Sequence, residues 1–251
     1  MTFDWKKYAI ILADGLLAVY LLLAVTAFNR PDESSEVCNE VNIHIEESII
    51  KGFLKADDIK VQLQRAHLYP LGDPLSAVDT RKMEDALRQN PFVKEAQVYK
   101  SQTGHVYVNL TQRLPIIRVK ADNGEDYYLD ELGNIMPNTH FVSDLAIATG
   151  PINHAYAKKT LTRVGRFLAQ NPLWSNQVEQ LNVLSDGSME MVPRVGDHIV
   201  YLGRPVKLDH KFARLEKFYR YGLSKAGWNK YSYISLEFDN QIICKKRNYK
   251  K

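Results

Sequence analysis

Apolar residues first gather in one long run near the N-terminus. Residues 8–28, YAIILADGLLAVYLLLAVTAF, include a single charged side chain, Asp14. A helix of that length rises about 31 Å, at roughly 1.5 Å per residue, which matches the hydrocarbon core of a bilayer. The run therefore predicts a transmembrane helix, with membrane-facing residues that include Tyr8, Leu16, Leu22 and Phe28.

The flanks of this run predict its orientation. Lys6 and Lys7 precede it, and mostly acidic residues follow it. Because basic flanks stay in the cytoplasm, residues 1–7 form a cytoplasmic tail and the rest of the chain is exported. A cleaved signal peptide is the alternative, although the run is longer than the usual apolar core of about 7–15 residues. Asp14 could contact another membrane helix or could simply be tolerated near the interface.

Beyond a polar linker at residues 29–36, the pattern becomes that of a small folded domain. Period-two alternation at residues 41–45 predicts a half-buried strand. Helical spacing follows in residues 54–66, with Ile59, Leu63 and Ala66 on the apolar face. Residues 69–80 contain two prolines and a glycine, which predicts a loop.

A second helix and two strands complete this first domain. Asp79 or Thr80 caps the helix, and Asn90-Pro91 stops it. Residues 93–100 are predicted to form a strand, Gly104 lies in the turn, and the return strand, with Val106, Val108 and Leu110 on its inward face, is ended by Pro115. The apolar positions of these elements are Met83, Ala86, Leu87, Ala96, Val98, Val106, Val108 and Leu110. The order β-α-α-β-β predicts an α+β sandwich spanning residues 37–114.

The remaining chain predicts a second α+β domain over residues 115–246, followed by a basic tail at residues 247–251. Strand-like segments occur near residues 116–121, 127–129, 178–184, 189–192 and 198–202. Two helical patterns interrupt them, with apolar stripes formed by Leu161, Val164 and Leu168 and by Phe212, Leu215 and Tyr219. We expect a mostly antiparallel β-sheet that carries helices, and a hinge to the first domain near residues 113–118.

The end of the chain predicts a β-hairpin. In YISLEF, residues 233–238, the side chains of Ile234, Leu236 and Phe238 share one face. Asp239-Asn240 suits a two-residue type I′ turn. QIICKK then returns as the last strand, which we expect at a sheet edge. An edge strand offers unpaired N–H and C=O groups to a strand from another chain.

Composition narrows the function class. The 251 residues are 45% hydrophobic and 25% charged, with a net charge of +4, which indicates a globular protein without the dense basic face of a nucleic-acid binder. The two cysteines, Cys38 and Cys244, are interpreted as free thiols. The basic tail is a solvated end, or it attracts acidic partner segments or lipid head groups.

Catalytic and metal-binding patterns are missing from the sequence. No His pair has metal-ligand spacing, no Cys-x-x-Cys occurs, and no Gly-rich phosphate loop follows a strand. The acidic stretch DNGEDYYLDELGN lacks the ligand spacing of a calcium loop, so its Asn-Gly and Gly-Asn pairs are interpreted as turns. Trp174 and Trp228 are expected to pin helices to the sheet. We expect no enzymatic activity, no metal and no cofactor.

Several motifs together resemble the bacterial division family FtsQ/DivIB. The first domain resembles a POTRA module, and a single anchor precedes it while QRLPIIR follows it. Downstream, YYLDELGNIMP, VYLGRPVKLDHKFARLEKF and YSYISLEFDNQIICKK resemble the family's strand-turn-strand, its Leu-Gly turn with a Lys-bearing helix, and its closing hairpin. The resemblance covers nearly the whole chain in the family's order.

The resemblance implies a scaffold in the cytoplasmic (inner) membrane that acts at the division septum. In the family the closing hairpin captures a strand of FtsB, which pairs with FtsL. Carried over by position, the receiving residues are Phe238, Asn240, Gln241, Ile242, Ile243 and Cys244. The family often has a basic residue just before the aromatic, where this chain has Glu237, so a side-chain salt bridge is in doubt. We expect Ile243→Pro to remove an edge donor.

The resemblance also implies contacts of the anchor and the POTRA module with FtsK and other division proteins. Candidate edges of this module are residues 41–45 and 104–112. Two rival functions are a POTRA-bearing chaperone that delivers proteins to an outer-membrane barrel and a tethered envelope enzyme. The final hairpin could also be an interior hairpin without a partner.

Overall fold

A computed structural model describes residues 5–27, 36–46, 54–138 and 144–248. Phe28, residues 29–35 of the predicted linker and the outermost residues of both predicted tails lie outside the described part. The chain divides into two compact units. The first comprises Met1–His44, Ala56–Leu87 and Ala96–Asn109, and the second comprises Ile45–Lys55, Arg88–Glu95 and Leu110–Lys251.

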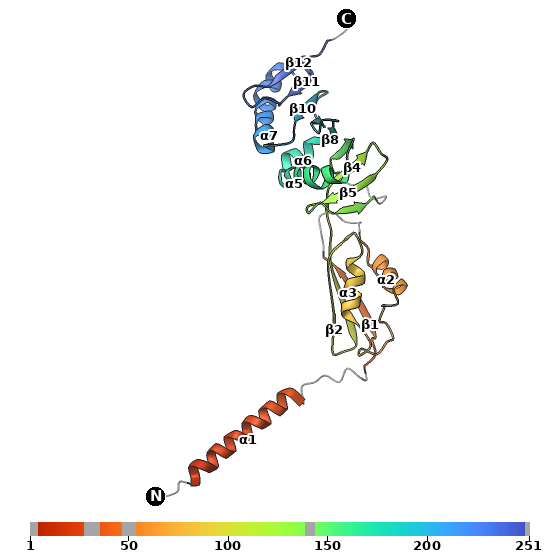
Figure 1. Ribbon diagram of the computed structural model, residues 1–251, viewed down its shortest axis with the longest axis vertical. Coiled ribbons are helices and arrows are strands. Elements are labelled where there is room, and N and C mark those ends of the chain that lie inside the picture. Colours follow the sequence, from red (N-terminus) through yellow and green to blue (C-terminus); the bar gives the residue numbers. More distant parts are fainter. Residues whose placement is uncertain (1–4, 28–35, 47–53, 139–143, 249–251) are drawn as a thin grey trace. The chain divides into compact units, whose positions relative to one another are not determined.

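The N-terminal apolar run forms helix α1, Trp5–Ala27, which is drawn in red in Figure 1. Its side chains are described for residues 12–24, and large apolar ones such as Leu16 and Leu22 are exposed. The prediction of a helix here is confirmed. Among the residues that the structure describes, no helix is both long and apolar enough to cross a membrane.

The first unit has the predicted order of elements. Strand β1 (Glu40–Ile45) is followed by helices α2 (Ala56–Arg65) and α3 (Thr80–Arg88) and by strands β2 (Val93–Lys100) and β3 (His105–Gln112). The sheet order is β1-β3-β2. Asp79 is the cap of α3, because its Oδ1 accepts a hydrogen bond from the Lys82 N–H at 3.0 Å.

One face of this three-stranded sheet forms the core. The strands contribute Ala96, Val98, Val106, Val108 and Leu110, and the helices contribute Ile59, Leu63, Met83 and Leu87, all of them buried. Burial alternates residue by residue along β3, as the sequence predicts. The prediction for Ala66 was wrong, because α2 ends one residue earlier and Ala66 is exposed.

The second unit is built on a nine-stranded sheet of order β12-β11-β10-β9-β8-β7-β4-β5-β6. The strands are β4 (Pro115–Ala121), β5 (Asp126–Asp130), β6 (Ile135–Pro137), β7 (Ile147–Gly150), β8 (Val178–Val183), β9 (Met189–Pro193), β10 (Ile199–Gly203), β11 (Tyr231–Ser235) and β12 (Ile243–Lys246). Pro115 therefore begins β4, a position where its missing N–H is tolerated.

The sheet is mixed. Antiparallel pairs join β4 to β5, β5 to β6, β8 to β9, β9 to β10 and β11 to β12. Parallel pairs join β4 to β7, β7 to β8 and β10 to β11. Strands β5 and β6 correspond to the strand-turn-strand that YYLDELGNIMP resembles, whereas β7 was not predicted, although it lies in the interior of the sheet.

The helices of the second unit are α4 (His154–Tyr156), α5 (Thr162–Gln170), α6 (Pro172–Gln177), α7 (Leu208–Lys217) and α8 (Ser224–Ala226), with π-helical turns η1 (Ala157–Leu161) and η2 (Phe218–Leu223). Helices α5, α6 and α7 lie along the same side of the sheet (Figure 1). The buried residues that share the core between them include Leu161, Val164, Leu168, Phe212, Leu215, Ile234 and Leu236.

Aromatic residues join the C-terminal helices to one another. The ring of Trp174 lies 4.7 Å from that of Phe212 and 6.1 Å from that of Tyr219, measured between centroids. The ring of Trp228 packs against Tyr219 at 5.2 Å. Both tryptophans pack on the core that the helices share with the sheet, but these ring contacts join helical segments to one another, so direct pinning to the sheet stays a prediction.

Candidate functional site

The C-terminal strand β12 lies at one end of the nine-stranded sheet, and β6 lies at the other. An edge position for the last strand is therefore confirmed. Its inner neighbour is β11, which is paired on its other side with β10. The outer side of β12 carries the backbone groups that could pair with a further strand.

The connection between the two last strands differs from the prediction. A two-residue turn at Asp239-Asn240 would place Ser235 opposite Cys244, but Ser235 lies opposite Ile243. The strands stop at Ser235 and start again at Ile243, so residues 236–242 form a longer loop that contains the turn. Phe238 leaves the face shared by Ile234 and Leu236 for the same reason, and it is 50% exposed.

The direction of the backbone groups follows from the pairing of β11. The Leu236 N–H donates to the Tyr201 carbonyl of β10 at 2.8 Å. Because successive residues of a strand direct their backbone groups to opposite sides, Ser235 directs its groups toward β12, where it meets Ile243. The N–H of Ile243 therefore faces β11, and the N–H of Cys244 faces outward. The edge donor expected at Ile243 is instead that of Cys244.

Basic residues at the N-cap and in the last turn of α7 hold the loop at residues 236–242. The Lys207 Nζ lies 2.8 Å from Asp239 Oδ2, and the Arg214 Nη2 donates to the Gln241 carbonyl at 2.6 Å. The hydrogen bond from Lys207 holds the pKa of Asp239 below its usual range. These contacts explain the lost two-residue turn, because they fix a wider loop over the helix.

Lys211 lies buried beneath the same loop. Its ammonium donates to the carbonyls of Leu202 and Arg204, the second at 2.9 Å. Burial lowers the pKa of Lys211, while the carboxylates of Asp239 and Glu237 oppose that shift. The side chain thus satisfies carbonyls that the turn after β10 leaves free, and it supports the position of the loop.

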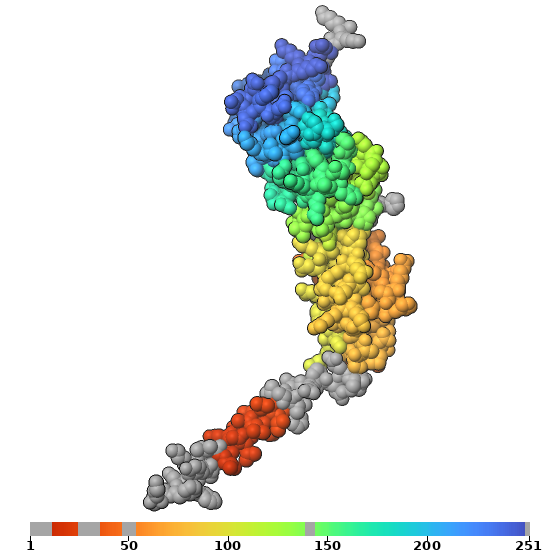
Figure 2. Space-filling view, viewed as in Figure 1, coloured from red at the N-terminus to blue at the C-terminus, as the bar shows by residue number. Residues whose placement is uncertain are grey.

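The two faces of β12 have different characters. Ile242 and Cys244 pack against the core, and burial raises the pKa of the Cys244 thiol. Ile243 is 47% exposed on the opposite face, and Lys245 and Lys246 are exposed as well. The hairpin reaches the surface of the second unit, where it is dark blue in Figure 2. Any added strand would meet an apolar side chain followed by two cations.

The residues that support this edge were not predicted from the sequence. Three basic residues at helical spacing face the loop: Lys207, Lys211 and Arg214. The opposite charges of Glu237 and Asp239 in the loop are the sequence signal that could have indicated this contact. Arg247 was assigned to a solvated tail. Its Nη1 instead lies 2.6 Å from Asp197 Oδ2, and its N–H donates to the Lys230 carbonyl at 3.0 Å.

His198 is expected to make the stability of the second unit depend on pH. Its Nε2 lies 2.8 Å from the Tyr219 hydroxyl, and its Nδ1 is buried with no partner in the described part of the chain. Burial, helped by the charge of Arg247, lowers the pKa of His198, and Asp197 opposes the shift. Because the unfolded state then binds more protons below about pH 6.5, stability is full above that pH and falls as the pH drops toward the lowered value.

We expect the free energy of unfolding of the second unit to decrease between pH 7.5 and pH 5, and His198→Gln to flatten that decrease. Urea unfolding followed by tryptophan emission measures both. His210→Gln is the matched control, since the His210 side chain is 53% exposed. An unchanged pH slope in His198→Gln would contradict the assignment.

The sheet of the first unit has one of its two expected edges, that at residues 41–45. Strand β3 is central in its sheet, so the edge predicted at residues 104–112 was wrong. The edges are β1 and β2. Cys38 is buried in this unit and Cys244 is half-buried in the other, each as a free thiol.

Comparison with known families assigns both units. The model described as FtsQ/DivIB, C-terminal related, matches residues 114–245, which are 132 of the 251 residues. The chain belongs to the FtsQ/DivIB family. A POTRA-like domain model matches residues 36–111 of this FtsQ/DivIB protein. A comparison with curated proteins gives no match.

Membership confirms the resemblance noted in the sequence. FtsQ/DivIB proteins are non-enzymatic, membrane-associated proteins of the bacterial division machinery. A POTRA-like unit followed by an FtsQ/DivIB unit fits a scaffold role in division. Family membership therefore indicates other division proteins as the general class of partner.

Proposed function

We propose that this FtsQ/DivIB protein is a non-enzymatic scaffold that captures FtsB- and FtsL-like proteins by adding a partner strand to β12 during septum formation. Phe238, Asn240, Gln241, Ile242, Ile243 and Cys244 are the proposed receiving residues. Main-chain hydrogen bonds would supply affinity, and the exposed side chains beside them would supply specificity.

The observation that carries this proposal is the edge position of β12 in a sheet whose other strands are paired on both sides, β6 excepted. The N–H of Cys244 faces outward in the register described above. Glu237 is exposed within the loop, and Lys245 and Lys246 follow on the strand itself. An acidic partner residue can therefore meet a cation on β12 rather than at the position before Phe238.

The proposal includes a membrane anchor formed by α1, with residues 1–7 in the cytoplasm and the two units outside. The apolar run at residues 8–28 and the exposed Leu16 and Leu22 support it. FtsK-like proteins are proposed to contact the first unit. Of the two edges predicted there, β1 is the one that lies at the margin of the sheet.

Site-specific photocrosslinking tests the proposed edge. We expect a photoreactive amino acid at Lys245 of the full chain in cells to crosslink to an FtsB-like protein. The same amino acid at Lys120 is the matched control, because Lys120 is exposed on β4, which is paired on both sides. Crosslinked products are identified by mass spectrometry.

Two outcomes would contradict the proposal. Equal crosslinking at both positions would indicate nonspecific proximity, and co-purification of the partner without any crosslink at Lys245 would move the site elsewhere. The match of the second unit to FtsQ/DivIB favours this function over delivery of proteins to an outer-membrane barrel. Crosslinks to barrel-assembly proteins alone would reverse that preference.

A further inference from the structure

A cavity of about 400 Å³ lies beside the turn between β5 and β6, at the opposite end of the sheet order from β12. Its lining residues all belong to the second unit and include Arg113, Asn134, Ile135, His154 and Lys158. The volume falls within the range of about 300–1,000 Å³ typical of small-ligand sites.

The close approach of two backbone segments builds this cavity. Gly133 in the β5–β6 turn has φ +81°, and a Cβ there would lie 2.8 Å from Thr162 Oγ1 and 3.2 Å from the Lys158 carbonyl oxygen. The turn therefore packs directly against the π-helical turn η1, which carries Lys158. π-Helical turns are often found at functional sites.

The carboxylate that contacts Arg113 and Asn134 of the lining has all its acceptor positions occupied. Asp130 accepts hydrogen bonds from Arg113 Nη1 at 2.8 Å, from the Leu132 N–H at 2.9 Å, and from Asn134 N–H and Nδ2 at 2.7 and 2.8 Å. Burial alone would raise the pKa of Asp130, but these hydrogen bonds outweigh burial and hold the pKa below its usual range. Asp130 thus neutralises the charge of Arg113, and its carboxylate is not available to pair with Lys158.

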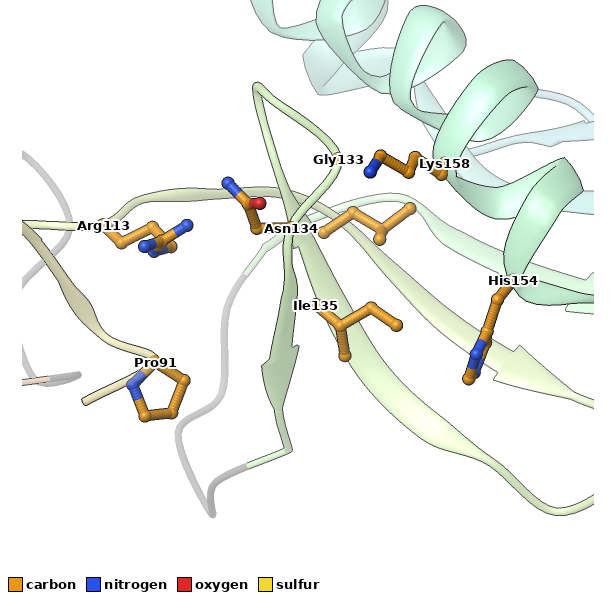
Figure 3. A pocket seen from close by; sticks show the side chains of 8 residues that line it. Pro91, Arg113, Gly133, Asn134, Ile135, His154 and Lys158 are labelled. Atoms are coloured by element: carbon orange, nitrogen blue, oxygen red, sulfur yellow. The ribbon is translucent and has the colours of Figure 1, made fainter. Parts of the chain in front are cut away.

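Two nitrogens around the cavity still lack an acceptor. Arg113 Nε is buried without a hydrogen-bond partner among the described residues, and Lys158 Nζ makes no ion pair within them. Arg113 and Lys158 lie on either side of Asn134, and His154 lies beyond Ile135 (Figure 3). The Nε2 of His154 already has a carboxylate partner, because it lies 3.1 Å from Glu125 Oε1. Within the part of the chain that the structure describes, one cation of the lining is therefore uncompensated and no carboxylate lines the cavity.

One exposed aliphatic side chain lines the cavity together with these cations, and another lies in the turn beside it. Ile135 lines the cavity and is 44% exposed, and Leu132 in the same turn is 63% exposed. A site that pairs one free cation with aliphatic surface suits a carboxylate flanked by apolar groups. A polyanion such as nucleic acid would need several phosphate-binding cations, which this site lacks.

We propose that this cavity binds an acidic side chain of a polypeptide partner, with its carboxylate near Lys158 and Arg113 and its aliphatic neighbours on Ile135 and Leu132. The site would be a second partner-binding surface, separate from β12. The ligand class is a short acidic segment in which Asp or Glu lies between aliphatic residues.

Fluorescence polarisation with the full chain in detergent micelles tests this site. The probe is labelled Ser-Leu-Glu-Leu-Ser with blocked ends, and its Gln counterpart is the reference peptide. We expect the Glu probe to bind about tenfold more tightly, and Lys158→Gln to remove that preference. Lys159→Gln is the matched control, because Lys159 is exposed on the same turn but lies outside the cavity lining. Ile135→Ser should weaken both peptides.

Equal binding of the two peptides, or a preference that persists in Lys158→Gln, would overturn the proposal. Displacement of the Glu probe by inorganic phosphate at equal concentration would also overturn it, because the site would then be one for small anions. Circular dichroism of each variant establishes that it is folded. Cys244→Pro should leave this peptide binding intact, so failure at β12 and failure here are distinguishable.

Discussion

Cys244→Pro will abolish capture of an FtsB-like strand, whereas Cys244→Val will preserve it. The N–H of Cys244 faces the free side of β12, and proline removes that donor and places its ring where an added strand would pair. One lost hydrogen bond and an unsatisfied acceptor on the partner cost about 1–3 kcal/mol, and the ring adds a steric term. We expect binding to weaken at least ~30-fold.

Pull-down of the partner from membranes that contain the full chain measures this effect. Proline is tolerated on an edge strand when its nitrogen faces solvent, so β12 should stay paired with β11. Valine keeps the donor and an apolar side chain of similar size against the core. Emission from Trp174 and Trp228 monitors the fold of the second unit. Undiminished capture by a folded Cys244→Pro variant would move the site away from β12.

Ile243→Pro should disrupt β12 itself rather than remove an edge donor. The N–H of Ile243 faces Ser235, so proline at this position should detach the start of β12 from β11. Partner capture would then be lost together with local structure. Comparing the two proline variants therefore separates loss of the outward donor from loss of the strand.

Gly150→Ala will destabilise the second unit by about 4 kcal/mol or more. Gly150 ends β7 with φ +110°, and a Cβ there would lie 2.1 Å from the Val183 carbonyl oxygen. That oxygen belongs to the backbone of β8 and cannot move aside without disturbing the parallel pair of β7 and β8. The clash adds to the cost of about 1–2 kcal/mol for a left-handed conformation in a residue with a side chain.

Urea unfolding of the full chain, followed by tryptophan emission, measures this loss as a lower transition midpoint. Gly124→Ala is the matched control, since Gly124 has φ +90° but nothing within 4 Å of the added Cβ. We expect the control to lose only the conformational cost, about 1 kcal/mol. Similar losses in both variants would show that the close approach to Val183 is not the cause.

The local pattern of the sequence was sufficient for most of the first unit. Strand β2 spans the predicted residues, and β3 buries alternate residues as expected. These elements are specified by neighbours along the chain: period-two alternation, a glycine with φ +78° at Gly104, and the Asp79 cap. The tertiary fold needs only to bring the apolar faces together.

Local signals were insufficient where distant segments decide the structure. Strand β7 has four residues and was missed, because its position depends on parallel pairing with β4 and β8 rather than on its own pattern. The two-residue turn at Asp239-Asn240 was wrong because Lys207 and Arg214, far earlier in the chain, hold a wider loop. The cavity at Lys158 had no sequence signal, since segments distant in sequence contribute its cations.

The sequence by itself determined the apolar N-terminal run, the order of elements and the family of this protein, because these depend on residue type and spacing along the chain. Only the tertiary structure decided that β6 forms the other end of the sheet, that β3 is central in the first unit, and which N–H of β12 faces outward. The physical reason is that an edge is defined by the absence of a neighbouring strand. Pairing between residues far apart in the chain creates that absence, and no local pattern encodes it.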